Sequence, residues 1–387
     1  MNEFLFQHLL GIDLFLAVVM LILLSNLRAL RRLGTFGTCH SFPFVSILVP
    51  ARDEERNIEA CVDSLLSQDY PDFEVLVLDD HSEDATLQLL QSMQERSDRL
   101  LVLRGEALPE GWTGKNWACH QLSERARGEL LLFTDADTRH APTMLREAVT
   151  AMQALELHVL SAFPREEVET WPERLLVPVF LWSILCFLPL PLAYRLRAPF
   201  LSVALGQCML FRREAYLKMG GHAAVRDAVV DDLALGRLVK THELRWRFLK
   251  GTDHFSCRMY TGLREVVDGF SKNLFAVFDY NLPLFLFVWT WLLIVFCEPP
   301  LLLALAPTAV FTSKVIAAAG AAFGLAMGMW MITYRVCAFP IRLALLYPLN
   351  ILGTMLVALR SVRLALSGGA VWKGRRLGRR PIRPFRF

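Results

Sequence analysis

Two long apolar stretches, one near each end of the chain, restrict what this sequence can fold into more than any other feature. The first covers 4–24, and the second covers 282–359 almost without interruption. About 20 consecutive apolar residues suffice for a helix to cross the hydrocarbon core of a bilayer. The region from 43 to about 170 has instead the mixed composition of a soluble α/β domain, although 54% of the whole chain is hydrophobic. We therefore expect a globular domain tethered to a membrane.

Basic residues predict how the chain is oriented in the membrane. Arg28, Arg31 and Arg32 follow the first apolar run rather than precede it, so 1–32 is expected to be an uncleaved anchor with a basic flank. Because such flanks stay in the cytosol, we expect a multi-pass protein of the cell membrane whose central domain is cytosolic. The tail, 364–387, carries seven Lys and Arg and is expected to contact anionic lipid in the cytosol. A nucleic-acid partner is disfavoured, because the net charge is only +3.

The other apolar segments are predicted to lie at or in the membrane. Residues 175–194 contain three prolines, which favours an interfacial or re-entrant helix over a span. Residues 261–280 are predicted to form an amphipathic helix at the interface, with the membrane segments following over 282–363. A cytosolic tail requires an even number of spans after the domain, two or four. Arginines on both sides of the last segment indicate that it could be re-entrant, so the count stays open. The candidate segments are Leu284–Phe296, Leu301–Phe311, Val315–Tyr334 and Leu343–Leu359. Glu298-Pro299-Pro300 is expected to break the helix between the first two.

Short apolar runs alternate with helical patterns across 43–260 and predict a mainly parallel sheet. Strands are expected at 45–49, 73–78, 100–105, 130–133 and 157–163. The eight cysteines show no C-x-x-C spacing, and we expect them to be reduced thiols.

Pairs of carboxylates stand where predicted strands end or a helix begins. Asp79 and Asp80 follow one strand, and Asp135 and Asp137 follow another in "LLLFTDADTRH". Two Asp at i and i+2 of an extended stretch point the same way and repel, which favours a divalent cation between them, although one such triplet is expected by chance in a chain of this length. Asp231 and Asp232 precede a helical pattern, where an ordinary N-cap is the alternative role.

Three carboxylate sites of this kind suit the transfer of a sugar from a nucleotide. One carboxylate can bind uridine, an Mg²⁺ or Mn²⁺ ion on the Asp-x-Asp pair can neutralise the diphosphate, and another carboxylate can accept the acceptor's proton. The charge that develops on the leaving diphosphate is the main electrostatic problem in such a transfer, and the metal addresses it.

The order of these motifs resembles family 2 glycosyltransferases of GT-A fold, in particular the membrane-bound subgroup linked to carotenoid and hopanoid glycosylation. The matching pieces, over about 45–280, are "VPARDEERNI", "VLDDHSEDAT", "GWTGKNWAC", "FTDAD", "GQCMLFRREAY", "GGHAAVRDAVVDDLALGRLVK" and "RMYTGLREVVDGFSKNLF". The resemblance implies a Rossmann-like α/β domain over 43–260 and a UDP-sugar donor.

The resemblance also implies roles for individual residues. Asp137 is the likelier direct metal ligand, with Asp135 beside it in the metal and diphosphate motif. Asp232 corresponds to the general base for inversion, and Asp231 stands where Glu is commoner, so their roles could be exchanged. The positions that correspond to the nucleotide-binding residues are Pro50, Ala51, Glu54, Asp80 and Lys115.

Other positions have weaker assignments. Gly206 and Gln207 line an acceptor pocket or form an ordinary strand-loop-helix junction. His222 belongs to a mobile loop or to a structural turn, and Arg258 is a candidate phosphate contact. The Gln-x-x-Arg-Trp motif of processive relatives is missing, and Lys272 could supply the positive charge there. Its absence favours a single transfer over polymer synthesis.

The function we expect is inverting transfer of a hexose, most simply glucose, from a UDP-sugar to a lipid or terpenoid in the membrane. Synthesis of a polyprenyl-phosphate sugar is the nearest alternative. A noncatalytic scaffold that binds nucleotide sugars is an alternative of another class. Transport is disfavoured, because the apolar segments carry few ionisable residues.

Overall fold

The chain folds into two compact units in the computed structural model, which describes residues 2–307, 310–369, 371–376 and 382. Unit 1 comprises Met1–Ala29, Val168–Pro191 and Tyr260–Phe387, and unit 2 comprises Leu30–Glu167 and Leu192–Met259. Of the predicted basic tail, residues 370, 377–381 and 383–387 lie outside the described residues.

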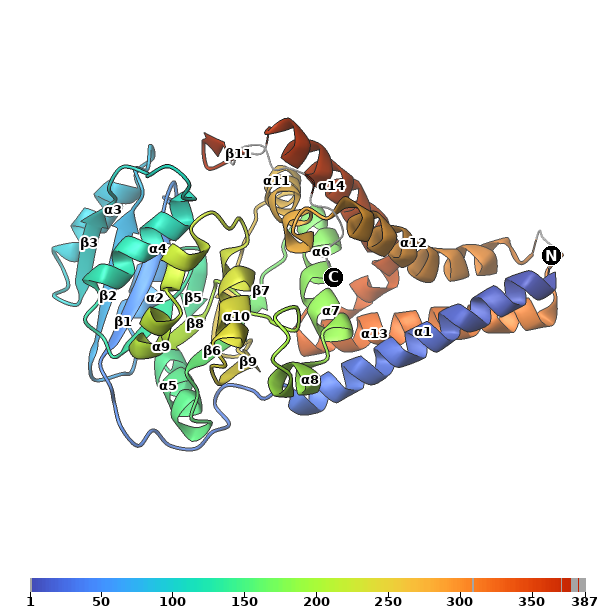
Figure 1. Cartoon of the computed structure of the whole chain (residues 1–387), viewed down its shortest axis with the longest axis horizontal. Helices are drawn as coiled ribbons and strands as arrows, with labels where there is room; N and C mark the ends of the chain where they lie inside the picture. The colour runs from blue at the N-terminus through green and yellow to red at the C-terminus, as the bar shows by residue number, and fades with distance from the viewer. Residues whose placement is uncertain (1, 308–309, 370, 377–381, 383–387) are drawn as a thin grey trace. The chain divides into compact units, whose positions relative to one another are not determined.

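Unit 2 is built on a seven-stranded sheet with the order β3-β2-β1-β4-β8-β6-β9 (Figure 1). Only the ladders that join β8 to β4 and to β6 are antiparallel, so the predicted mainly parallel sheet is confirmed. The strands are β1 (Val45–Ala51), β2 (Phe73–Asp79), β3 (Leu100–Arg104), β4 (Leu130–Phe133), β6 (Val159–Phe163), β8 (Met209–Arg212) and β9 (Trp246–Lys250).

The central strand β1 is buried along almost its whole length, which explains its continuous apolar sequence. Val45, Ile47 and Val49 pack in one core with Ile58 and Val62 of the following helix. The helices of unit 2 are α2 (Ile58–Leu66), α3 (Thr86–Gln94), α4 (Gly114–Arg125), α5 (Met144–Ala154), α9 (Arg213–Lys218) and α10 (Asp231–Thr241), with a 3₁₀ turn, η1, at Gly221–Val225.

A second sheet of three very short strands, which the sequence analysis did not predict, lies in unit 2 in the order β5-β10-β7. These strands are β5 (Thr138–His140), β7 (Arg165–Glu166) and β10 (Phe255–Cys257). Because β5 begins one residue after Asp137, this sheet lies directly beside the Asp-x-Asp segment.

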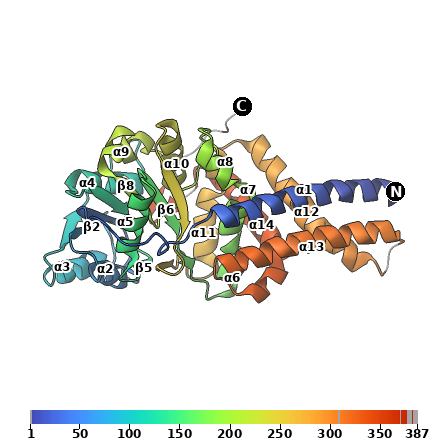
Figure 2. The ribbon, with the colours of Figure 1, turned by 90° about the horizontal axis from the view of Figure 1, so that it is seen from below.

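Among its described residues, unit 1 contains four helices that are long and apolar enough to cross a membrane. They are α1 (Asn2–Ala29), α12 (Leu282–Leu305), α13 (Ser313–Val336) and the segment Ile341–Ser367, which combines a 3₁₀ turn, η3 (Ile341–Leu346), with α14 (Tyr347–Ser367). Figures 1 and 2 both show α1 alongside α13.

Among the described residues, three long apolar helices follow the soluble domain, where the sequence suggested four separate segments. Glu298-Pro299-Pro300 is not the break that we expected between the first two segments, and the number of helices that cross the membrane stays a prediction. In the structure α12 continues through Pro299 and Pro300, as prolines are tolerated in membrane helices when neighbouring helices satisfy the freed backbone groups.

The proline-containing segment 175–194 is not one helix but parts of three, α6 (Trp171–Leu176), α7 (Pro178–Phe187) and α8 (Leu190–Arg195). Pro178 occupies the first turn of α7, where its missing N–H is harmless. The predicted amphipathic helix is present as α11 (Leu263–Asn273), followed by a 3₁₀ turn, η2 (Ala276–Phe278).

Candidate active site

The parallel register of the main sheet brings two of the carboxylate pairs to one edge. Ala51 of β1 lies opposite Asp79 of β2, and Leu48 of β1 lies opposite Phe133 of β4. Asp80 and Asp135 therefore begin loops at the carboxyl edge of the sheet, where ligands bind in open α/β folds.

The loops that follow β1 and β2 hold each other in place. The N–H of Asp80 donates to the carbonyl of Ala51 at 2.8 Å, and the N–H of Glu54 donates to Oγ1 of Thr86 at 2.8 Å. A guanidinium nitrogen of Arg52 donates to the carbonyl of Asp80 at 2.6 Å. Of the predicted nucleotide-binding residues, the structure thus brings together Pro50 and Ala51 at the end of β1 with Glu54 and Asp80 on the two adjoining loops.

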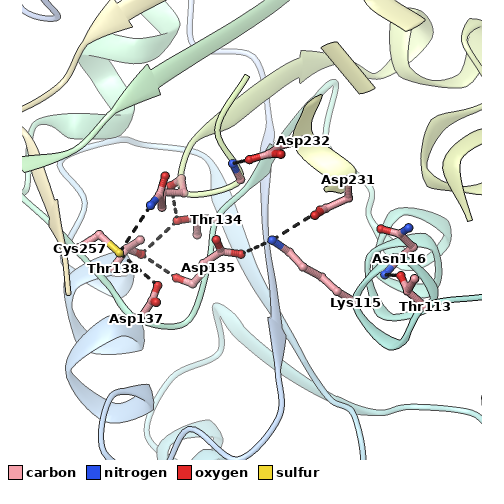
Figure 3. Close-up of polar contacts among 12 residues, drawn as sticks. Thr113, Lys115, Asn116, Thr134, Asp135, Asp137, Thr138, Asp231, Asp232 and Cys257 are labelled. Carbon is pink, nitrogen blue, oxygen red and sulfur yellow. Dashed lines mark hydrogen bonds and ion pairs between the residues drawn. The ribbon is translucent and has the colours of Figure 1, made fainter. Parts of the chain in front are cut away.

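The Asp-x-Asp segment is a turn rather than an extended strand, which corrects one prediction. Thr138 closes the turn, because its N–H and its hydroxyl donate to the carbonyl of Asp135 at 3.3 and 2.8 Å. The two carboxylates consequently meet different partners (Figure 3): Oδ1 of Asp135 lies 2.7 Å from Nζ of Lys115, and Oδ1 of Asp137 accepts from Sγ of Cys257 at 3.4 Å.

Lys115 connects the Asp-x-Asp turn to the third carboxylate pair. It stands in the first turn of α4, whose N-cap, Thr113, accepts from the N–H of Asn116. Its ammonium lies 2.7 Å from Asp135 and 3.5 Å from Oδ2 of Asp231 (Figure 3). Burial opposes the charge, but Asp135 and Asp231 outweigh it and raise the pKa of Lys115 well above its ordinary value. Lys115 is therefore a fixed positive charge.

Asp232 has the environment expected of a general base. Its Oδ2 accepts from the N–H of Gly206 at 3.1 Å, and its Oδ1 accepts from the N–H of Leu233 at 2.7 Å. Burial, reinforced by the charge of Asp231 and partly offset by Lys115, raises the pKa of Asp232 to about 6. A carboxylate with such a pKa is ionised at neutral pH yet basic enough to accept a proton during a reaction.

Gly206 lies where the three charged groups meet. A Cβ added there would stand 2.8 Å from Nζ of Lys115 and 3.3 Å from Oδ2 of Asp135. The next residue, Gln207, is buried and accepts at its carbonyl from Oγ1 of Thr134 at 2.8 Å. The Gly206-Gln207 junction therefore belongs to the site.

The remaining predicted residues are placed differently. His222 is buried against the ring of Phe133, its Nδ1 lies 2.7 Å from the hydroxyl of Tyr216, and burial lowers its pKa to about 4. This environment favours the structural-turn alternative. The N–H of Arg258 contacts the carbonyl of Asp137 at 3.4 Å, which brings Arg258 to the site. Lys272 lies on α11 in unit 1, so its predicted role stays a prediction.

The sequence analysis missed Glu166 and Cys257, which the three-stranded sheet brings to the Asp-x-Asp turn. Burial and the charge of Asp137 raise the pKa of Glu166 well above its ordinary value, a shift that a nearby cation would reverse. Strands of two and three residues leave no periodic signal, so only the cluster of acids in "PREEVE" could have drawn attention to this segment.

Comparison with known proteins identifies the domain. Residues 46–220 match the family described as Glycosyl transferase family 2. These residues form a family 2 glycosyltransferase domain. A mannosyltransferase from Pyrobaculum calidifontis, solved with GDP-Man and Mn²⁺, superposes with a TM-score of 0.52 at 16% identity, over 94% of this chain and 98% of that chain. The predicted GT-A fold is thereby confirmed.

The names of two curated relatives contain diacylglycerol and 4,4'-diaponeurosporenoate. The chain is 38% identical over 130 residues to a beta-monoglucosyldiacylglycerol synthase from Trichormus variabilis, covering 33% of this chain and 25% of the relative. It is 24% identical over 233 residues to a 4,4'-diaponeurosporenoate glycosyltransferase from Staphylococcus haemolyticus, covering 59% of this chain and 60% of the relative. The matches thus span a quarter to three fifths of the relatives' length.

Proposed function

We propose that this protein transfers a hexose from a UDP-sugar to a hydroxyl or carboxyl group of a membrane lipid or terpenoid, with inversion at the sugar. The observation that carries the proposal is the arrangement of Lys115 between Asp135 and Asp231, with Asp232 beside them at a pKa of about 6. It combines a fixed cation for the leaving diphosphate with a carboxylate that can accept a proton.

The residues present suit a divalent metal that the substrate helps to hold. Among the described residues, no three His, Cys, Asp or Glu side chains converge closely enough to bind an ion by themselves. Mg²⁺ commonly binds through one or two carboxylates and completes its coordination with substrate phosphates and water. Asp137 and Asp135 would hold such an ion, and when bound it would neutralise charge on the diphosphate.

The side chains of the site divide the reaction between them. Asp232 accepts the proton of the acceptor hydroxyl while the hydroxyl oxygen bonds to the anomeric carbon. The bond from that carbon to the diphosphate breaks, and its electron pair leaves with UDP. Lys115 stabilises the negative charge that develops there. The two backbone N–H groups that hold Asp232 fix the orientation of its carboxylate before the acceptor binds.

An apolar groove in unit 1 supports the choice of a lipid acceptor. The groove has a volume of about 610 Å³ and lies between α6, α11 and α14, with Trp171, Leu175, Leu263 and Leu356 among its walls. Its size is that of a small-molecule site, and its walls match an acyl or isoprenoid chain. We propose that it binds the apolar part of the acceptor. Names of the curated relatives, a diacylglycerol glucosyltransferase and a carotenoid-acid glycosyltransferase, support the same class.

The basic flank after α1 supports a cytosolic position for the family 2 domain. Nucleotide-sugar donors would then reach the site from the cytosol, and the acceptor would come from the adjoining membrane.

The test uses the full chain in detergent with Mn²⁺ and a panel of UDP- and GDP-sugars, measuring thermal shift and donor hydrolysis, and then transfer to diacylglycerol or a carotenoid acid. We expect a metal-dependent shift with one UDP-sugar that is lost in Asp137→Ala. Transfer only to polyprenyl phosphate would support the alternative synthase. Binding of a nucleotide sugar without turnover towards any acceptor would support the scaffold.

A further inference from the structure

A buried carboxylate that the proposed reaction does not use lies next to the Asp-x-Asp turn. The three-stranded sheet aligns Glu166 of β7 with Cys257 of β10, and Cys257 with Thr138 of β5. Thr138 directly follows Asp137, so the sheet register places Glu166 two strands from the proposed metal ligand. Glu166 is only 3% exposed.

Hydrogen bonds connect Glu166 to Asp137 through two side chains. Nε2 of Gln207 donates to Oε1 of Glu166 at 3.1 Å and contacts Sγ of Cys257 at 3.8 Å. Sγ of Cys257 in turn donates to Oδ1 of Asp137 at 3.4 Å. The same Gln207 follows Gly206, whose N–H holds Asp232. Glu166 thus orients a residue that contacts the Asp-x-Asp side of the site and directly follows the glycine that holds Asp232.

The other carboxylate oxygen of Glu166, Oε2, takes no part in these hydrogen bonds. Oε2 is fully buried, and no group among the described residues hydrogen-bonds to it. A buried polar atom without a partner is costly, so one in a native site calls for a specific explanation. The neighbourhood suggests a donor that arrives with the substrate, since the acids beside it would accept a hydrogen bond and not donate one.

Glu166 lies two strands away from Thr138, the residue after Asp137, and reaches Asp137 only through Gln207 and Cys257, so we do not assign it as a direct ligand of a metal on Asp137. A metal-bound water would instead bridge the remaining distance and supply the missing hydrogen-bond donor. Residues that hold metal ligands or metal-bound water in this way commonly change metal affinity by 10- to 100-fold when mutated.

We propose that Glu166 is a positioning residue for the divalent metal: its Oε2 accepts a hydrogen bond from a metal-bound water while its Oε1 holds Gln207. This inference rests on the proposed function, because it requires a metal on Asp137.

The experiment titrates Mn²⁺ into the full chain in detergent with UDP or GDP present and follows free Mn²⁺ by electron paramagnetic resonance. We expect Glu166→Gln to weaken Mn²⁺ binding by roughly 10- to 100-fold. The matched control is Glu167→Gln, the adjacent acid, which is half-buried and pairs with Arg165 at 3.7 Å. It should bind Mn²⁺ within about twofold of the native protein.

Thermal unfolding separates this role from a merely structural one. Glutamine keeps the oxygen that accepts from Gln207, so Glu166→Gln should unfold without metal at the native temperature or slightly above it, and only the stabilisation by Mn²⁺ should shrink. Native Mn²⁺ affinity in Glu166→Gln, or a lower unfolding temperature in the absence of metal with unchanged affinity, would overturn the inference.

Two further variants, Glu166→Asp and Asp137→Asn, distinguish the remaining outcomes. If Glu166→Gln does not fold, Glu166→Asp must show weakened Mn²⁺ binding for the inference to stand. Asp137→Asn serves as the reference for loss of a ligand. Failure of the native protein to bind Mn²⁺ with either nucleotide would overturn the metal-dependent mechanism itself, whereas loss in Asp137→Asn without any loss in Glu166→Gln would overturn the present inference alone.

Discussion

A single added methyl group at Gly206 should separate donor binding from folding. In Gly206→Ala the new Cβ would lie 2.8 Å from Nζ of Lys115, and ordinary contact begins at 3.4 Å, so the ammonium must retreat by roughly 0.6 Å. Oδ2 of Asp135, at 3.3 Å from the new Cβ, limits the direction of retreat. The displacement takes the ammonium away from Asp135 and from the position in which we expect it to meet the diphosphate.

The expected loss follows from the value of one charge-assisted hydrogen bond, about 1.5–3 kcal/mol. Donor affinity should therefore fall by roughly 10- to 150-fold. Folding should change little, because a flexible lysine end can move and Gly206 has no left-handed backbone angle that alanine would strain.

The assay is calorimetric titration of UDP in the presence of Mn²⁺, with thermal unfolding of the same samples. Gly236→Ala is the matched control. Gly236 lies on the helix that carries Asp232, and its new Cβ would make only ordinary contacts, at 3.6 Å, with Ala204 and Ser202. In a Lys115→Met background the effect of Gly206→Ala should largely disappear, because the group that it displaces is gone. An affinity for UDP in Gly206→Ala within twofold of the native value would refute the reasoning.

Three further predictions concern pH, metal and stability. Because the pKa of Asp232 is raised to about 6 and its ionised form is the base, kcat/KM should be flat above pH 7 and fall tenfold per pH unit well below 6, whereas Asp232→Asn should lack this limb. Chelation of divalent metal should abolish donor-induced thermal stabilisation in the native protein and change nothing in Asp137→Ala. Glu74 is buried and accepts from Arg127 and Ser46, which lower its pKa despite burial; its stabilisation should be present at neutral pH and be lost as pH falls below the usual carboxyl range. Glu74→Gln should accordingly lower the free energy of unfolding at pH 7 in chemical denaturation by no more than about 1 kcal/mol, because Arg127 is largely exposed to solvent, with kcat/KM unchanged.

Strands with a strong apolar signal could be predicted from the sequence, and short or antiparallel strands could not. β1, β2, β4 and β6 are apolar runs buried in the main sheet, and their order along the chain predicts parallel pairing. The strand β8 inserts antiparallel between β4 and β6, a pairing that depends on contacts distant in sequence.

The candidate site divides in the same way. Asp80, Asp135, Asp137 and Asp232 could be found because strand ends and a helix start mark their positions. The direction of the carboxylates could not, since it depends on the turn that Thr138 closes. Glu166 reaches the site through its hydrogen bond with the buried Gln207. No pattern in the acidic run around Glu166 predicts that contact.

The position of helix ends in the membrane segments was equally hard to predict. Pro299 and Pro300 interrupt helices in water, where a lost backbone hydrogen bond is simply replaced by solvent. In α12 they lie inside a helix packed within unit 1, and the helix continues. Tertiary packing therefore overrides the local preference.

The central claim, that Asp232 removes the acceptor's proton, is tested most directly by Asp232→Asn assayed for transfer to a lipid hydroxyl. We expect the turnover rate to fall by roughly 10²–10⁴-fold while UDP affinity and unfolding temperature stay near the native values. The exposed Asp227→Asn, in the loop before the same helix, serves as the control. Transfer by Asp232→Asn at the native rate would contradict the claim and favour an acceptor that is already ionised, such as a polyprenyl phosphate.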